Sequence, residues 1–181
     1  CLHPEELRDK AAERGVSVSI PSDFWRRVTE RHDHGSDDNY HEHAQRRFED
    51  VEETERLYFN HYDRTEFTAA VETIESVDDV YHVVLNRSAF YPTGGGQEHD
   101  TGRIGEDKVV DVFDEGGRVV HVMPSVSFEE GDEVHGEIDF ERRLQLSQHH
   151  TATHIITGCA REYLGEHVWQ AGASKTEDKA R

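Results

Sequence analysis

Short stretches in the middle of the chain have a pattern of apolar and polar residues that predicts β-strands. The stretches are rich in apolar residues and are separated by turn residues, and the last of them alternates regularly. The strands expected from this pattern are 67–74, 80–85, 109–113, 119–122 and 133–138. Gly116-Gly117 separates two of them and predicts a hairpin turn. Short strands at this spacing are typical of a small barrel-like β unit, here 51–140.

The N-terminal part of the chain has a helical pattern instead. A proline near its start and a glycine at its end delimit a predicted helix over 4–14, and a Ser-Asp cap precedes a second over 24–32. Glycine, serine and aspartate then dominate 33–39, which makes this stretch the best candidate for a boundary. Residues 1–50 are therefore expected to form a short helical segment and a linker.

A third pattern begins at about Glu141 and predicts a long helix. Its apolar residues are distributed around most of the helical wheel, which predicts a helix buried on several sides. These residues are Ala152, Ile155, Ile156, Ala160 and Leu164. The expected fold class is α+β: a short helical N-terminal segment, a small β-barrel-like unit, and a mixed α/β part over 141–181.

The chain is strongly acidic, with 39 Asp and Glu against 20 Lys and Arg and a net charge of −19. A surface of this kind repels polyanions at low ionic strength, whereas concentrated salt screens the repulsion. Only four of the 20 basic residues are lysines. Acid-rich and lysine-poor surfaces suit a high-salt cytoplasm, so a halophilic source is expected. An acidic disordered region is disfavoured, because 34% of the residues are hydrophobic and their patterns are regular.

The sequence also indicates a compartment. No apolar run approaches the roughly 20 residues that span a bilayer, and no charged-then-apolar leader opens the chain. Cys1 and Cys159 are the only thiols, too few for a disulfide framework. A soluble, cytoplasmic protein is expected. Because the chain starts at Cys1 rather than Met and stops at Arg181, we expect a segment of a longer protein.

Two histidines on the predicted helix are candidate metal ligands. His150 and His154 are four residues apart, so both imidazoles project from one face of a helix and could share a zinc ion. Such a pair also arises by chance in a chain with 14 histidines. Spacing alone therefore leaves two interpretations open, a metal site and a pair of hydrogen-bonded structural histidines.

A glycine-rich loop is the second candidate site. Gly94, Gly95 and Gly96 allow positive φ angles and a close approach of the backbone to a ligand, and Gln97 adds two donors and an acceptor. A simple turn is the alternative interpretation. The loop is not a nucleotide-binding P-loop, because that motif ends in Gly-Lys-Ser/Thr.

Both motifs resemble those of one family, the editing domain of archaeal-type alanyl-tRNA synthetases. One motif is His150-Thr151-Ala152-Thr153-His154, followed by Leu164-Gly165-Glu166-His167-Val168-Trp169-Gln170-Ala171-Gly172. The other is Ser88-Ala89-Phe90-Tyr91-Pro92-Thr93-Gly94-Gly95-Gly96-Gln97, with Asp100-Thr101-Gly102 just after it. Residues 57–71 and 131–143 fit the same domain, and 2–32 resemble the end of the tRNA-recognition region that precedes it. The resemblance therefore extends over nearly the whole chain.

The resemblance implies a fold, an activity and a cofactor. Residues 141–181 would be the start of the α/β editing domain, truncated at Arg181. The editing domain would hydrolyse the ester of Ser-tRNA(Ala) and Gly-tRNA(Ala). The parent protein would attach alanine to tRNA(Ala) with ATP, in a catalytic region before Cys1. Zinc would be bound by His150 and His154, and by a Cys-x-x-x-His element downstream. With two ligands, the isolated segment is expected to bind zinc weakly and to be inactive.

The resemblance also assigns roles to individual residues. Gln97, Thr151 and Thr153 are the expected catalytic residues. Ser88, where the family usually has threonine, would bind the acceptor end together with the glycine loop, Gly94, Gly95, Gly96 and Gln97. The expected partner is tRNA(Ala). Binding to a membrane or to DNA is not expected. The alternatives are a freestanding deacylase that edits in trans and a noncatalytic RNA-binding module. The arginines Arg142, Arg143 and Arg161 are candidate phosphate contacts, although ion pairing with acidic residues on the surface is the favoured interpretation.

Overall fold

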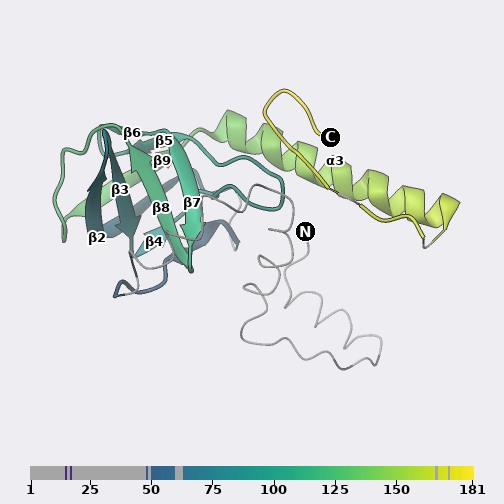
Figure 1. Ribbon diagram of the computed structural model, residues 1–181, viewed down its shortest axis with the longest axis horizontal. Coiled ribbons are helices and arrows are strands. Elements are labelled where there is room, and N and C mark those ends of the chain that lie inside the picture. Colours follow the sequence, from purple (N-terminus) through teal and green to yellow (C-terminus); the bar gives the residue numbers. More distant parts are fainter. Residues whose placement is uncertain are drawn as a thin grey trace.

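A β-barrel, a long helix and an extended C-terminal segment follow one another in the computed structural model (Figure 1). The structure describes residues 15, 17, 48, 50–59, 63–165, 167–170 and 172–181. The helices predicted over 4–14 and 24–32 and the boundary predicted over 33–39 lie outside these described residues. The barrel lies at one end of the helix, and the helix extends away from it (Figure 1).

Seven antiparallel strands form one sheet that is nearly closed. Their order in the sheet is β6-β5-β9-β2-β3-β8-β7. The two end strands, β6 and β7, are separated in sequence by Val110 alone, whose N–H donates to the carbonyl of Val122 in β8 at 2.9 Å. The chain itself therefore joins the two ends of the sheet. The strands are β2 (Glu66–Val77), β3 (Val80–Leu85), β5 (Gly102–Ile104), β6 (Asp107–Val109), β7 (Asp111–Glu115), β8 (Arg118–Met123) and β9 (Glu133–Ile138).

A smaller parallel pair lies beside the barrel. It consists of β1 (Glu55–Arg56) and β4 (Arg87–Ser88). A single 3-10 turn, η1 (Leu57–Phe59), follows β1. The N–H of Thr54, just before β1, donates to the carbonyl of Gly117 in the turn between β7 and β8 at 3.1 Å, which connects the pair to the barrel. These contacts place β4 at the point where the chain leaves the barrel and enters the glycine-rich loop.

The strand predictions are confirmed in outline. Strands 80–85 and 133–138 match β3 and β9, and 67–74 and 119–122 lie within β2 and β8. The predicted strand 109–113 is divided, because β6 ends at Val109 and β7 runs from Asp111 to Glu115. The hairpin at Gly116-Gly117 is confirmed, and both glycines have the positive φ angles, 57° and 93°, that a two-residue hairpin turn requires.

Apolar side chains on the inward faces of the strands fill the barrel. In β9 every second residue is buried, and Gly136 is one of these. A Cβ atom at Gly136 would lie 2.3 Å from the ring of Phe67 on β2, so only glycine leaves space for this ring. The fully buried members of the main core are Val83, Leu85, Ala89, Phe90, Ile104, Val109, Val112, Val119 and Met123. Val84 and Val120 belong to a second, smaller cluster with Phe48.

A buried histidine, His121 on β8, lies in this apolar core. Its Nδ1 bonds the carbonyl oxygen of Val83 at 3.0 Å, and its Nε2 bonds the hydroxyl of Ser88 at 2.8 Å. The Ser88 hydroxyl also accepts a hydrogen bond from the N–H of Phe90 at 3.1 Å. Desolvation lowers the pKa of His121 from its ordinary value of 6.5 to about 4. The folded protein therefore holds this imidazole neutral.

Stability is accordingly expected to fall between pH 6.5 and pH 4. Over this range the unfolded chain takes up a proton at His121 and the folded chain does not, so protonation favours unfolding. The contribution is about 3 kcal/mol at its full extent. Urea unfolding across this pH range, compared with a His121→Gln variant, isolates the contribution. A matched His135→Gln change, at an exposed histidine on β9, should leave the pH dependence unaltered. Equal pH dependence in wild type and His121→Gln would contradict the assignment.

The long helix α3 spans Phe140–Leu164. Asp139 caps its start by accepting a hydrogen bond from the N–H of Arg142 at 3.2 Å, and Gly165 lies at its end. Burial on several sides was expected for this helix, and that expectation is wrong. Of its residues only Arg143 and Leu146 are buried.

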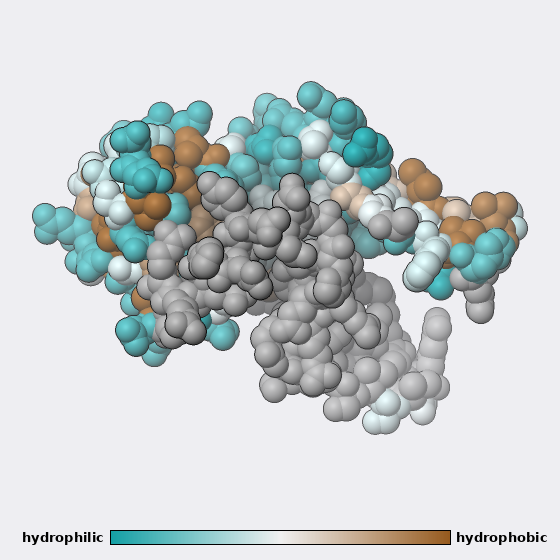
Figure 2. All heavy atoms as spheres, viewed as in Figure 1, coloured by the Kyte–Doolittle hydropathy of each residue, from teal (hydrophilic) through white to brown (hydrophobic). Residues whose placement is uncertain are grey.

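The second half of α3 is exposed instead. Ile155 and Ile156 are 61% and 68% exposed, and Leu164 is 66% exposed. Figure 2 shows the corresponding hydrophobic surface at the end of the molecule that is farthest from the barrel. The helix contacts the barrel with its first turns only, so apolar residues farther along cannot reach the core. The hydrophobic positions on a helical wheel show which side of a helix favours burial. They do not show whether another part of the chain covers that side.

Candidate functional site

The glycine-rich loop connects β4 to β5 and forms a tight turn. Gly94 and Gln97 bond each other through both backbone N–H groups, at 3.1 and 2.9 Å, and the intervening Gly95 and Gly96 have φ angles of 59° and 74°. At the base of the loop, the N–H of Tyr91 donates to the Asp100 carboxylate at 2.6 Å. The left-handed backbone at two successive positions explains the glycine requirement.

A buried ion pair ties this loop to α3. The guanidinium of Arg143 bonds both carboxylate oxygens of Asp100, with Nε at 2.9 and 3.0 Å, and also donates to the carbonyl of Ala89 at 2.6 Å. Arg143 is 4% exposed and Asp100 is fully buried. Arg142 forms surface ion pairs with Glu98 and Glu177. Both arginines form ion pairs, as the favoured interpretation predicted, but the pair of Arg143 is buried and not on the surface. Arg161 is exposed on α3.

The side chain of Gln97 joins the two motifs that the sequence singled out. Gln97 is 4% exposed, and its Oε1 lies 2.8 Å from Nδ1 of His150, 53 residues later in the chain. A neutral imidazole that donates from Nδ1 to this amide oxygen has its lone pair at Nε2, the nitrogen that a metal would bind. Metal-binding histidines are commonly oriented by a hydrogen bond of this kind at the other nitrogen. Gly95 also lies beside this ring, because a Cβ atom there would be 3.8 Å from Cε1 of His150.

The two histidines lie together on one face of α3, as the spacing predicted. Their rings stack with centroids 4.9 Å apart and an interplanar angle of 28°. His150 is half-buried and His154 is exposed. Among the described residues no group of three or more His, Cys, Asp or Glu side chains could hold a metal ion. The two imidazoles alone are fewer than the three or four protein ligands of a firm zinc site.

The other predicted site residues have different surroundings. Ser88 is fully buried and its hydroxyl bonds His121 in the barrel core, because β4 directs this side chain inward. Thr153 is on α3 and its hydroxyl donates to the carbonyl of His149 at 2.8 Å. Thr151 is an exposed residue of the same helix. The structure thus brings together Gly95, Gln97, His150 and His154, and it places Ser88 elsewhere.

The C-terminal segment covers the glycine loop, a contact that no sequence pattern indicates. A Cβ atom at Gly96 would lie 2.2 Å from the carbonyl oxygen of Ala173. The N–H of Lys175 donates to the carbonyl of Gly96 at 2.6 Å, and the Lys175 ammonium donates to that of Gly95 at 2.8 Å. Farther along, the Thr176 carbonyl is bonded by His149 at 2.8 Å. The site is thus built from the loop, α3 and this segment.

A comparison with protein families found a match over most of the chain. A family model described as tRNA synthetases class II (A) matches residues 2–142, more than half of the chain. The chain belongs to this family. The match includes the N-terminal segment, the barrel and the glycine loop, and it ends in the first turn of α3.

Several curated members of the family are similar over 99% of this chain. The alanine-tRNA ligase of Halorubrum lacusprofundi is 42% identical over 184 residues. Those of Natronomonas pharaonis and Methanopyrus kandleri are each 43% identical, over 191 and 187 residues. The chain spans about a fifth of the length of these relatives, 20% in each case. These alignments extend past the family match and include the histidine motif and Lys175.

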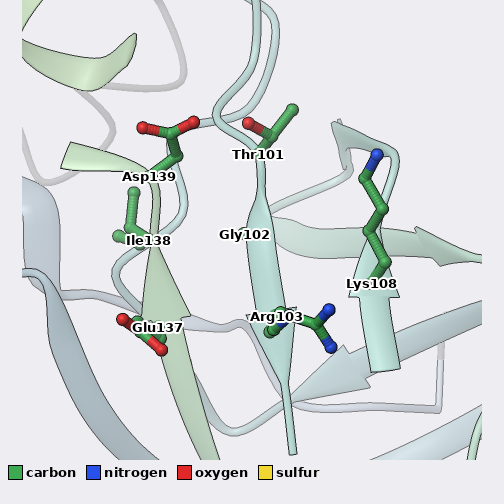
Figure 3. Close-up of a pocket in the computed structure, with 7 residues that line it drawn as sticks. All are labelled: Thr101, Gly102, Arg103, Lys108, Glu137, Ile138 and Asp139. Carbon is green, nitrogen blue, oxygen red and sulfur yellow. The ribbon is translucent and has the colours of Figure 1, made fainter. Parts of the chain in front are cut away.

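A separate hollow of about 480 Å³ lies on the barrel of this family member. Figure 3 shows carboxylates on its β9 side, from Glu137 and Asp139, and cations on its β5 and β6 side, from Arg103 and Lys108. Arg103 is a cross-strand neighbour of both Glu137 and Lys108. The positive and negative charges around the hollow balance, and neither the glycine loop nor the histidines line it. The candidate site therefore remains at Gln97 and His150.

Among the described residues, α3 included, no helix is long and apolar enough to cross a membrane.

Proposed function

We propose that this chain is part of an alanine-tRNA ligase and belongs to its editing domain, which hydrolyses Ser-tRNA(Ala) and Gly-tRNA(Ala). The observation that carries the proposal is the hydrogen bond between Gln97 and His150. It joins the glycine loop and the histidine motif, the two parts of the sequence that resemble the editing domain. The alanine-tRNA ligase relatives, which align over 99% of the chain, support the same assignment.

The site has chemical groups that suit ester hydrolysis. His150 and His154 fit half of a zinc site, and the further ligands would come from elsewhere in the polypeptide. When bound, zinc would act as a Lewis acid on an ester oxygen or orient the acceptor end. Gln97 would hold both His150 and the aminoacyl end. The N–H groups of Gly95 and Gly96 donate to no acceptor within the described chain, so they are available to a developing oxyanion.

The parent protein would use ATP to attach alanine to tRNA(Ala), in a region outside this chain and in the cytoplasm. The two alternatives are a freestanding deacylase and a noncatalytic RNA-binding module. The family match over residues 2–142 includes the segment before the barrel, which favours the synthetase over the freestanding deacylase. Release of serine from mischarged tRNA would separate an editing domain from a noncatalytic module.

The test uses the full-length gene product that contains this chain. We expect wild type to contain zinc, to attach alanine to tRNA(Ala), and to release serine from Ser-tRNA(Ala). His150→Ala should lose zinc and reduce serine release by at least about a hundredfold, because the loss removes one metal ligand and the partner of Gln97. Gln97→Ala should reduce serine release while retaining zinc. Zinc content and single-turnover deacylation are the measurements.

The matched control is His135→Ala, at an exposed histidine of the barrel strand β9. It should leave alanine attachment, zinc content and serine release at wild-type levels. If wild type attaches alanine but releases no serine, the editing proposal fails and the family assignment stands. If His150→Ala changes only thermal stability, the pair is structural and the metal proposal fails.

A further inference from the structure

Lys175 is a buried lysine at the edge of the candidate site. It is 3% exposed and is the only buried residue among those described in 165–181. Its ammonium donates to the carbonyl of Gly95 at 2.8 Å. Gly95 also lies beside the ring of His150, so Lys175 and His150 both contact the same residue of the loop. The positive charge is therefore held at the site itself.

This charge has no carboxylate partner in the described part of the chain. Buried lysines are normally paired with an acidic group, and this chain has 39 of them. None of the ion pairs among described residues includes Lys175. Its desolvation is unfavourable for the charged form and lowers the pKa of the ammonium. An ammonium has three donors, and the bond to Gly95 uses one of them.

Docking of the C-terminal segment does not require this ammonium. The backbone N–H of Lys175 already donates to the carbonyl of Gly96 at 2.6 Å, and the Lys175 carbonyl accepts from the N–H of Glu98 at 3.1 Å. His149 adds a third contact, to the carbonyl of Thr176. A neutral side chain at position 175 would keep all three. The buried charge therefore indicates a second role, toward an anion that binds at the loop.

The substrate of the proposed editing reaction limits what this anion can be. The amino acid carries a positive α-ammonium group and is joined through its carboxyl group, so the ester has no negative charge. The phosphates of the acceptor end are the formal negative charges of the substrate. We propose that Lys175 binds a phosphate of the single-stranded acceptor end of a tRNA while it holds the carbonyl of Gly95. This inference rests on the proposed editing function.

The experiment measures RNA binding by the full-length gene product at low and high potassium chloride. The probe is an uncharged RNA hairpin with a single-stranded CCA end. Lys175→Met should bind it about tenfold more weakly at low salt, since the change removes a charged hydrogen bond. The difference in affinity between Lys175→Met and wild type should narrow as the salt concentration rises. The slopes of log affinity against log salt should differ by about 0.7, the value for the loss of one phosphate contact on a single strand. Lys175→Arg, which keeps the charge, should retain the wild-type salt dependence.

The matched control is Lys179→Met. Lys179 lies in the same segment but is exposed, and its backbone N–H bonds the hydroxyl of Thr176. The Lys179→Met variant should bind the hairpin with an affinity within about twofold of wild type, as expected for a residue that does not contact the phosphate. Equal losses in Lys175→Met and Lys179→Met would overturn the inference, since they would indicate general charge attraction. A Lys175→Met variant that only unfolds at lower temperature, with wild-type affinity, would also overturn it.

Failure of the inference can be distinguished from failure of the proposed function. If wild type releases serine from Ser-tRNA(Ala) and Lys175→Met has wild-type affinity and salt dependence, only the role of Lys175 is wrong. If wild type neither binds the hairpin nor releases serine, the proposed editing function is wrong, and the inference about Lys175 is wrong as well. If Lys175→Arg instead has the weakened binding and the altered salt dependence expected of Lys175→Met, charge is not the relevant property and the inference is overturned.

Discussion

Replacement of Arg143 by methionine is expected to lower the free energy of unfolding by about 3–5 kcal/mol, the effect of leaving one partner of a buried ion pair uncompensated. Asp100 is fully buried, and Arg143 supplies it with charged hydrogen bonds through Nε and a terminal nitrogen. Methionine is similar in length and apolar, so it fills the space but leaves the carboxylate and the Ala89 carbonyl without this donor. Urea unfolding at neutral pH is the measurement.

The neighbouring Arg142 provides the control for this prediction. Its ion-pair partners Glu98 and Glu177 are 43% and 61% exposed, so Arg142→Met should lower the free energy of unfolding by about 1 kcal/mol or less. A double variant, Asp100→Asn with Arg143→Met, removes both buried charges and keeps an acceptor for the N–H of Tyr91. It should recover part of the loss. Similar losses in Arg142→Met and Arg143→Met would show that the buried pair does not anchor α3.

A Gly96→Ala change is expected to separate the C-terminal segment from the loop. The added methyl would lie 2.2 Å from the carbonyl oxygen of Ala173, and the φ angle of 74° disfavours alanine. The left-handed backbone and the overlap together are worth about 2–5 kcal/mol. Movement of 173–176 relieves the overlap, so the amide of Lys175 should lose its protection from hydrogen exchange while the barrel keeps its own. Hydrogen exchange and thermal unfolding are the measurements.

Gly94→Ala is the matched control two positions earlier in the loop. Gly94 does not have a positive φ angle, and the nearest atom to an added Cβ would be the carbonyl oxygen of Pro92 at 3.7 Å, an ordinary contact. This variant should retain protection at Lys175 and unfold within about 1 kcal/mol of wild type. If Gly94→Ala and Gly96→Ala behave alike, the close approach of Ala173 is not the reason for glycine at position 96.

The sequence predicted most of the barrel because β3 and β8 are short runs of mostly apolar residues, and because β2 and β9 have one face in the core and one in water. Alternation is then visible in the residues themselves, as in β9, where Val134, Gly136 and Ile138 are buried. The shortest strands of the barrel sheet, β5 and β6, have three residues each and contain too little alternation to be detected. The start of α3 was also predictable, since Asp139 precedes the helical pattern as a cap.

The site was predicted only in part, because its contacts join residues that are far apart in the chain. The four-residue spacing of His150 and His154 is local, so the stacking of their rings on one face of α3 could be expected. The contact of Lys175 with Gly95 joins residues 80 positions apart, and no local pattern marks it. The exposure of Ile155 and Ile156 was missed for a similar reason, since periodicity does not show which surface lies opposite a helix.

The order of the elements along the chain has a consequence for synthesis on the ribosome. The last strand of the barrel ends at Ile138, whereas the histidines lie on α3 and Lys175 follows still later. A nascent chain can therefore close its barrel before the histidine motif and Lys175 have emerged. The glycine loop would be synthesised early and would be covered only when residues 173–176 arrive. Assembly of the site is then a late event that follows folding of the barrel and does not drive it.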